Sequence, residues 1–167
     1  MEQVNGNKYK PFGEALLFGA SAQERVADKL RAAGGFANKH DDLSRYDFEL
    51  HFNNHVYRVE VKNEDNYAAS GNICIETRQG WPLKVSGVAY SEATIFIHTF
   101  EENCALYRRR EMHVWLRNEL KEGRRYEQRF GDNNNRGFVI SINDLLDYEW
   151  FDFCIFNKLA CSFLWSF

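Results

Sequence analysis

Asp47, Glu60 and Lys62 have the side-chain types needed to bind a divalent metal beside a phosphate group. In the segment VEVK (59–62), Glu60 and Lys62 alternate with two valines, and Asp47 stands in a similarly alternating segment. Carboxylate oxygens are the protein ligands that Mg²⁺ prefers, with water and substrate phosphate completing its octahedron. A lysine in the same space can orient an attacking water or offset charge in the transition state. The sequence therefore predicts metal-dependent chemistry here, provided that the fold brings these residues together.

A predicted β-hairpin would bring Asp47 and Glu60 together. Segments 45–52 (RYDFELHF) and 55–62 (HVYRVEVK) alternate on either side of an Asn-Asn pair at 53–54, which is typical of a two-residue turn. In that register the numbers of paired residues sum to 107, so Asp47 lies opposite Glu60, with Cβ atoms about 4.5–5.5 Å apart. Two such close carboxylates repel unless a cation or a shared proton relieves them.

The same alternation sorts the hairpin into two faces. The expected core face holds Tyr46, Phe48, Leu50, Tyr57, Val59 and Val61, and the expected polar face holds Arg45, Asp47, Glu49, Arg58, Glu60 and Lys62. The polar face has a second interpretation that the pattern leaves open. Glu49–Arg58 and Asp47–Lys62 would form cross-strand ion pairs on a solvated sheet, each worth well under ~1 kcal/mol.

The remaining segments predict a mixed α/β domain. Residues 11–35 indicate a helix that ends at a Gly-Gly pair, and residues 111–120 indicate a second helix. Segments 71–78 and 93–100 predict central strands, and 105–109 indicates a further short strand. Segment 137–148 predicts a strand followed by a short helix with Asn143 as its N-cap. We therefore expect a sheet with helices on its faces.

Length and composition place the chain among soluble single-domain proteins. It has 167 residues, of which 44% are hydrophobic and 27% charged. We expect one domain over 1–167, with a core of about 13–147 and an aromatic segment, 148–167, that packs on it or forms a subunit interface. No membrane span or signal peptide is indicated. The four cysteines lack CxxC spacing, which favours reduced thiols and a cytoplasmic location.

The net charge of −3 hides a local basic segment. Residues 108–136 carry nine basic and five acidic side chains, a local net charge of +4. Such a stripe predicts contacts with a polyanion, although a solvated helix surface explains it equally well. The candidate nucleic-acid contacts are Arg78, Lys84, Ser86, Arg108, Arg109, Arg110, Arg124 and Arg125.

These residues, taken in order, resemble the PD-(D/E)XK nuclease superfamily. Asp47, about a dozen residues, and then Glu60-Val61-Lys62 match its motif, and the helix SAQERVADKLRAAGGF is similar to its opening helix. The segments GNICIETR and SGVAYSEATIFIHTF resemble the later core strands of phage and prokaryotic members, including Holliday-junction-resolvase-like ones. The resemblance implies an α/β, restriction-endonuclease-like fold, with a mixed central β-sheet flanked by helices.

The resemblance also implies roles for individual residues. Mg²⁺ or Mn²⁺ would be held by Asp47, Glu60, the Val61 carbonyl and Glu24 of the opening helix, and Lys62 would position the attacking water. Glu24 has a competing interpretation, because Ser21-Ala-Gln-Glu24 is a capping box.

Two positions nearby leave the family pattern or stay open. Where relatives have Lys-Ala-Asp, this chain has Glu92-Ala93-Thr94. Glu76 is either a further acidic ligand or a strand-end glutamate paired with Arg78 or Lys84.

The sequence thus leads to a Mg²⁺-dependent endonuclease acting on DNA, with catalytic residues Asp47, Glu60, Lys62 and Glu24. Branched DNA and RNA-containing substrates fit the same site, and resolvase-like relatives are commonly homodimers. Two alternatives remain: a catalytically silent nucleic-acid-binding or assembly protein with the same fold, and an interaction domain that acts through residues 148–167.

Overall fold

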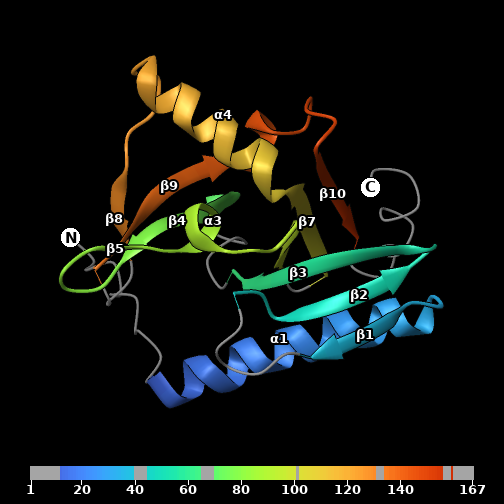
Figure 1. The fold of residues 1–167 in the computed structure, drawn as a ribbon. Helices are drawn as coiled ribbons and strands as arrows, with labels where there is room; N and C mark the ends of the chain where they lie inside the picture. Colours follow the sequence, from blue (N-terminus) through green and yellow to red (C-terminus); the bar gives the residue numbers. More distant parts are fainter. Residues whose placement is uncertain are drawn as a thin grey trace, which may run out of the picture.

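The computed structural model describes residues 12–39, 45–64, 70–100, 102–130, 134–155 and 159. These residues form two β-sheets and a small set of helices (Figure 1). The helices are α1 (Phe12–Ala32), α3 (Gly87–Tyr90), α4 (Arg109–Lys121) and the 3₁₀ helix η1 (Ile142–Asp144). The strands are β1 (Phe36–Lys39), β2 (Phe48–Phe52), β3 (His55–Asn63), β4 (Asn72–Gln79), β5 (Lys84–Val85), β6 (Ile95–Thr99), β7 (Asn103–Arg108), β8 (Gln128–Phe130), β9 (Asn135–Ser141) and β10 (Phe151–Ile155).

The larger sheet is mixed and six-stranded, in the order β1-β2-β3-β6-β7-β10. β3 and β6 run parallel, and every other neighbouring pair is antiparallel. The second sheet is antiparallel, in the order β5-β4-β9-β8. The predicted fold class is confirmed as mixed α/β, with a mixed central sheet flanked by helices. The strand predicted at 71–78 forms, but as β4 of the second sheet and not as a central strand of the first.

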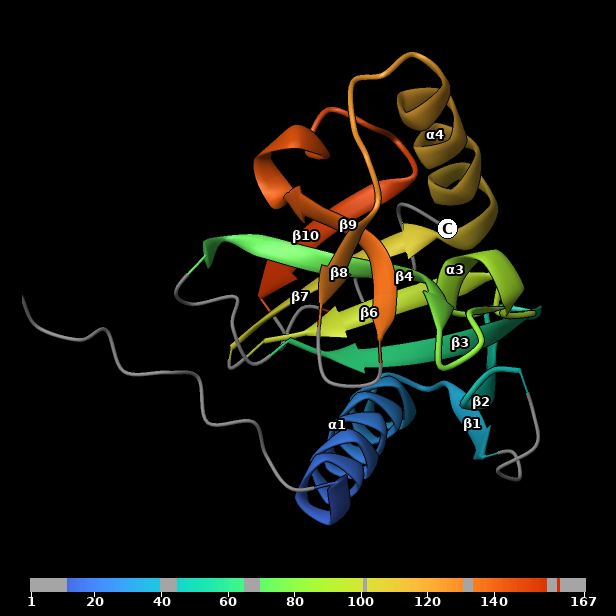
Figure 2. The ribbon, with the colours of Figure 1, turned by 90° about the vertical axis from the view of Figure 1, so that its left-hand side faces the viewer.

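The large sheet is covered on both faces, as Figures 1 and 2 show. α1 lies along one face, where Val26, Ala27 and Leu30 are fully buried against Val59 and Ile97. Burying a side chain of the size of valine or leucine stabilises the fold by roughly 1.5–3 kcal/mol.

The opposite face of the large sheet is covered by the second sheet and α4. Phe96 and Tyr107 point to this side and pack with Ile75, Met112 and Phe138. Alternation along β6 explains both cores, because Ile95 and Ile97 face α1 while the residue between them faces β4.

Two other local predictions have different outcomes. β10 pairs with β7, so residues 151–155 of the aromatic segment pack on the body as one of the two interpretations expected. The N-cap of η1 is Ser141, whose side chain accepts from the Asn143 amide, so the prediction of Asn143 as N-cap is wrong. Residues 156–158 and 160–167 lie outside the described part of the chain.

Candidate active site

The β2–β3 hairpin forms in the predicted register. Phe52 pairs with His55 and Phe48 pairs with Val59. Asn53 and Asn54 have φ angles of 50° and 63°, as a type I′ turn requires of its two central residues. This hairpin aligns the segment around Glu60 with the residues that precede β2.

Asp47 is fixed to β3 on both sides of Glu60. Its backbone amide donates to the Val59 carbonyl at 2.9 Å, and its Oδ2 accepts from the Val61 amide at 2.6 Å. Its Oδ1 accepts from Nε2 of Gln23 on α1 at 2.9 Å. The carboxylate therefore lies where α1 meets the edge of the hairpin, with both of its oxygens hydrogen-bonded.

The strand pairing between β2 and β3 begins at Phe48, so Asp47 lies one residue outside it. The paired ladder stops at Phe48 and Val59, and Asp47 lies just outside β2. The core-face assignment of Tyr46 is wrong: its ring packs with the second core, and its hydroxyl donates to Glu49 at 3.1 Å. The physical reason is that residues 45–47 leave the extended pairing, so period-two alternation no longer applies to them.

Glu60 and Lys62 form a close ion pair on β3. The Lys62 Nζ donates to the Glu60 Oε1 at 2.6 Å, and only 14% of the Glu60 side chain is exposed. Burial disfavours the ammonium, but the charge and hydrogen bond of Glu60 outweigh it, helped by Asp47 and Glu76. The pKa of Lys62 is consequently raised above its usual value. Lys62 is thus a cation in the metal-free chain.

Asp47 carries an unfavourable charge in this environment. Burial and then the neighbouring charge of Glu60 raise the pKa of Asp47 to about 6, although the Val61 amide and the charges of Lys62 and Lys39 oppose the shift. When a second carboxylate raises the pKa of a carboxyl, a bound cation stabilises the ionised form of the pair. The expected repulsion between Asp47 and Glu60 is therefore present.

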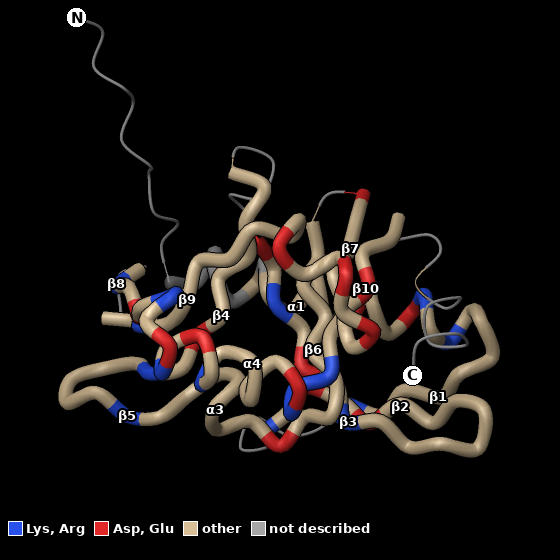
Figure 3. The backbone as a smooth tube through the Cα atoms, turned by 90° about the horizontal axis from the view of Figure 1, so that it is seen from above, with Lys and Arg blue, Asp and Glu red and all other residues tan. Residues whose placement is uncertain are grey.

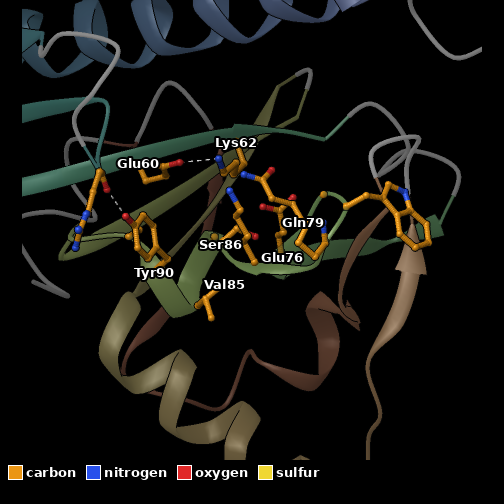
Figure 4. Close-up of a pocket in the computed structure, with 14 residues that line it drawn as sticks. Glu60, Lys62, Glu76, Gln79, Val85, Ser86 and Tyr90 are labelled. Atoms are coloured by element: carbon orange, nitrogen blue, oxygen red, sulfur yellow. Dashed lines mark hydrogen bonds and ion pairs between the residues drawn. The ribbon is translucent and has the colours of Figure 1, made fainter.

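Glu60 and Lys62 open onto a cleft of about 1130 Å³ between β3 and the β4–β5 region (Figure 4). Glu76 of β4 lines the same cleft, and its charge contributes to the raised pKa of Lys62. Arg78 forms an ion pair with Glu127 at 3.7 Å. The role of Glu76 as a further acidic ligand stays a prediction.

Ser86 and Gly87 bring α3 against β4 at the wall of the cleft. Gly87 has a φ of +51°, and a Cβ there would lie 2.2 Å from the Glu76 carbonyl oxygen, so only glycine fits. Ser86 is 4% exposed, lines the cleft, and its Oγ has no hydrogen-bond partner among the described residues. A buried hydroxyl facing a cleft in this way is suited to bind an oxygen of a ligand.

The donor set suits Mg²⁺ or Mn²⁺ in the way that such ions are commonly held. Among the described residues, no three His, Cys, Asp or Glu side chains lie close enough to form a complete metal site by themselves. Mg²⁺ usually takes one or two carboxylates and fills its other positions with water and substrate phosphate. Asp47 and Glu60 would supply those carboxylates, and their roles as metal ligands, like that of the Val61 carbonyl, stay predictions.

The opening helix contacts the site through Gln23 and not through Glu24. Glu24 forms ion pairs with Lys39 at 2.8 Å and Arg31 at 3.1 Å, and hydrogen bonds from these two residues lower its pKa. The capping box is wrong, because α1 begins at Phe12 and Ser21 lies inside the helix. A signal for Gln23 exists in the sequence, since it falls on the buried stripe that continues through Val26, Ala27 and Leu30.

The predicted nucleic-acid contacts divide into separate groups. Lys84 and Ser86 line the cleft with Glu60, whereas Arg108, Arg109 and Arg110 line a second cavity of about 350 Å³ at the start of α4. Figure 3 shows Lys and Arg interspersed with Asp and Glu over the described chain, so basic residues do not form one continuous stripe.

Arg124 and Arg125 are committed to ion pairs within the fold. Arg124 donates to Glu119 at 2.6 Å and also pairs with Glu122. Arg125 pairs with Asp144 and lies over the Trp115 ring at 5.3 Å from its centroid. These contacts fix the chain after α4, which favours the structural interpretation of this half of the basic segment.

The described chain has a mixed α/β fold, with Asp47, Glu60 and Lys62 at its β2–β3 hairpin. The chain is similar in structure to I-Ssp6803I, a bacterial homing endonuclease, with a TM-score of 0.51 and 14% sequence identity. The match covers 81% of this chain and 84% of that one. No protein-family model and no curated protein matches the sequence. In the described residues, no helix is long and apolar enough to cross a membrane.

Proposed function

We propose that this protein is a metal-dependent nuclease that hydrolyses phosphodiester bonds of DNA, as an endonuclease of the PD-(D/E)XK type. One observation carries the proposal. Asp47 is hydrogen-bonded to the backbone of β3 on both sides of Glu60, and Lys62 forms an ion pair with Glu60 at the mouth of a cleft. The similarity in fold to a homing endonuclease supports it, because that protein acts on nucleic acid by its name.

Each of the site residues would have a separate role in hydrolysis. Asp47 and Glu60 would hold Mg²⁺ or Mn²⁺, with Glu76 as a further acidic group facing the cleft. The bound metal would supply Lewis acidity at the scissile phosphate and lower the pKa of a water. Lys62, a cation by its raised pKa, orients that water and offsets negative charge as it develops on the phosphate. Gln23 and the Val61 amide hold the Asp47 carboxylate in place.

Cleavage of plasmid and branched DNA with Mg²⁺ tests the proposal. Lys62→Ala and Asp47→Ala are each expected to lower the rate at least about 100-fold, the scale of losses for groups that act in the transition state. Lys29→Ala on α1 is the matched control and is expected to keep the wild-type rate. Equal cutting by all four preparations would mean that the activity is a contaminant and that the assignment fails.

A catalytically silent nucleic-acid-binding or assembly protein is the second candidate. It is favoured because both carboxylate oxygens of Asp47 already accept hydrogen bonds, and one carboxylate oxygen of Glu60 already accepts a hydrogen bond from Lys62. This candidate predicts DNA binding without cleavage and no change in Tm on adding Mn²⁺. The nuclease predicts a higher Tm with Mn²⁺, because a ligand that binds only the folded state stabilises it.

Residues 148–167 are unsuited to a simple deletion test of an interaction domain. Residues 151–155 form β10, which pairs with β7 along the register Phe151 to Tyr107. Removing them would expose the edge of the large sheet, so loss of partner binding would report damage to the fold.

A further inference from the structure

The cleft that holds Glu60 and Lys62 has a rim of exposed aromatic and aliphatic side chains. Trp81 is 77% exposed, Val85 56% and Tyr90 50%, and all three line the cleft. In Figure 4, Tyr90 is drawn toward the Glu60 end of the cleft and Gln79 toward the Lys62 end. Apolar side chains left in water around a polar site commonly mark a binding surface.

Trp81 lies in the turn of the β4–β5 hairpin, which a hydrogen bond from a distant residue restrains. β4 and β5 pair through Arg78–Val85 and Gln79–Lys84, so residues 80–83 form the connection. Asn134, which is 1% exposed, donates from Nδ2 to the Gly80 carbonyl at 3.1 Å. An indole presented by a fixed turn loses little conformational entropy when a ligand covers its face.

The charges beside this ring identify the kind of ligand. Lys84 and Lys62 line the same cleft as Trp81, and the buried Ser86 hydroxyl adds a donor that has no partner among the described residues. On the Tyr90 side, the Arg45 guanidinium lies 4.4 Å from the ring centroid. Aromatic faces combined with cations and hydroxyl donors bind single-stranded nucleic acid, in which bases stack on rings while phosphates meet the cations.

We propose that Trp81 stacks on an unpaired base of a strand bound in the cleft that Glu60 and Lys62 line, so that the substrate is DNA with unpaired bases and not an uninterrupted duplex. The inference rests on the proposed nuclease function and specifies its substrate class. In a duplex the faces of the bases are covered by their neighbours, and exposing one costs a few kcal/mol per step. A junction, bubble or flap presents that face already exposed.

Binding to fluorescent oligonucleotides in EDTA tests the inference without cleavage. The probes are a duplex and a bubble of the same sequence, with 2-aminopurine in the bubble. Wild type is expected to bind the bubble more tightly than the duplex and to change the 2-aminopurine fluorescence. Trp81→Ala should lose about 10- to 100-fold in affinity for the bubble, the range that stacking on one base supplies.

Two matched variants make the result specific. Trp81→Phe keeps an aromatic face and is expected to retain most of the preference. Tyr126→Ala removes an aromatic that is 72% exposed but does not line the cleft, and is expected to bind as wild type does. The inference is overturned if Trp81→Ala keeps the wild-type ratio of bubble to duplex affinity, which would assign the apolar rim to another partner.

The outcomes separate this inference from the nuclease assignment. Lys62-dependent cleavage without any effect of Trp81 on substrate preference would leave the nuclease standing and reject the stacking role. A Trp81-dependent preference for the bubble without Lys62-dependent cleavage would do the reverse.

Discussion

The carboxylate of Asp47 accepts a hydrogen bond from the backbone amide of Val61 at 2.6 Å, while its own backbone amide donates to Val59. The residue between these two partners is Glu60. A side chain at the end of one strand is thus anchored to the backbone of the next strand on both sides of a second carboxylate. The fold maintains this pair although burial and the charge of Glu60 raise the pKa of Asp47 to about 6.

Asp47→Asn is expected to stabilise the metal-free protein while abolishing cleavage. The asparagine can still accept from the Val61 amide, and it can donate to Gln23 if the Gln23 amide turns over, so both hydrogen bonds survive. The repulsion with Glu60 is lost. We expect a gain of roughly 2–3 kcal/mol in the free energy of unfolding at pH 8 in EDTA, measured by urea denaturation. A loss of stability would contradict a repulsive pair.

The stability of the metal-free protein should depend on pH through Asp47. Its pKa is raised on folding, from 3.8 to about 6, so the folded state binds more protons than the unfolded state between these values. This contribution is therefore present at low pH and is lost as the pH rises through about 6, amounting to roughly 2–3 kcal/mol. Comparing wild type with Asp47→Asn in EDTA from pH 4 to pH 8 isolates it. The gap between the two curves should widen with pH, and a constant gap would refute the raised pKa.

Gly87→Ala should destabilise the protein more than an alanine substitution at another glycine with a similar positive φ. Gly87 and Gly123 both have positive φ, +51° and +69°, but a Cβ at Gly123 meets nothing within 4 Å, whereas one at Gly87 meets the Glu76 carbonyl at 2.2 Å. Gly123→Ala is expected to cost about 1 kcal/mol from the left-handed conformation alone. Gly87→Ala should cost clearly more, and it should also weaken DNA binding. Equal changes in Tm would show that α3 can move away from β4.

A buried hydrogen-bond chain beneath the site should be important for stability. Glu64 accepts from His98 Nδ1 at 2.7 Å and from the Cys74 amide at 3.1 Å, and His98 Nε2 lies 3.0 Å from the Tyr107 hydroxyl. The chain links Glu64, which directly follows β3, with β4, β6 and β7. Leaving one buried partner unsatisfied costs about 1–3 kcal/mol.

Tyr107→Phe is the cleanest probe of that chain, because it keeps the ring that stacks on Phe96 and removes only the hydroxyl. Thermal denaturation should show a loss of about 1–3 kcal/mol. The comparison is Tyr57→Phe, which alters a half-buried tyrosine at the other core. Loss of equal size in both variants would mean that the chain has no special role.

Local patterns in the sequence predicted the β2–β3 hairpin and its register well. The Asn-Asn turn and the strict alternation determine the register from neighbouring residues alone, which is why Phe48 and Val59 pair as expected. The same logic failed at Tyr46, where the extended backbone ends. Alternation holds only while pairing continues, and the sequence does not state where pairing stops.

Features that depend on packing between distant segments were less predictable. An apolar strand such as 72–79 does not indicate which sheet it joins, and the second sheet is what places Glu76 beside Glu60. Gln23 and Glu24 are neighbours on α1, yet successive helical residues point about 100° apart. Only the buried stripe of the helix distinguishes them. In the sequence Trp81 looks like an ordinary turn residue, and only the pairing of β4 with β5 places it at the rim of the cleft.

The Mg²⁺ dependence of single-turnover DNA cleavage, measured for wild type, Glu60→Gln and Lys62→Met, tests the central claim most directly. We predict that Glu60→Gln raises the Mg²⁺ concentration needed for half-maximal rate, because it removes a carboxylate that we propose as a metal ligand. We predict that Lys62→Met lowers the maximal rate at least about 100-fold without raising that concentration. Wild-type cleavage with the same rate and the same Mg²⁺ dependence as both variants would contradict the assignment of this hairpin as the active site.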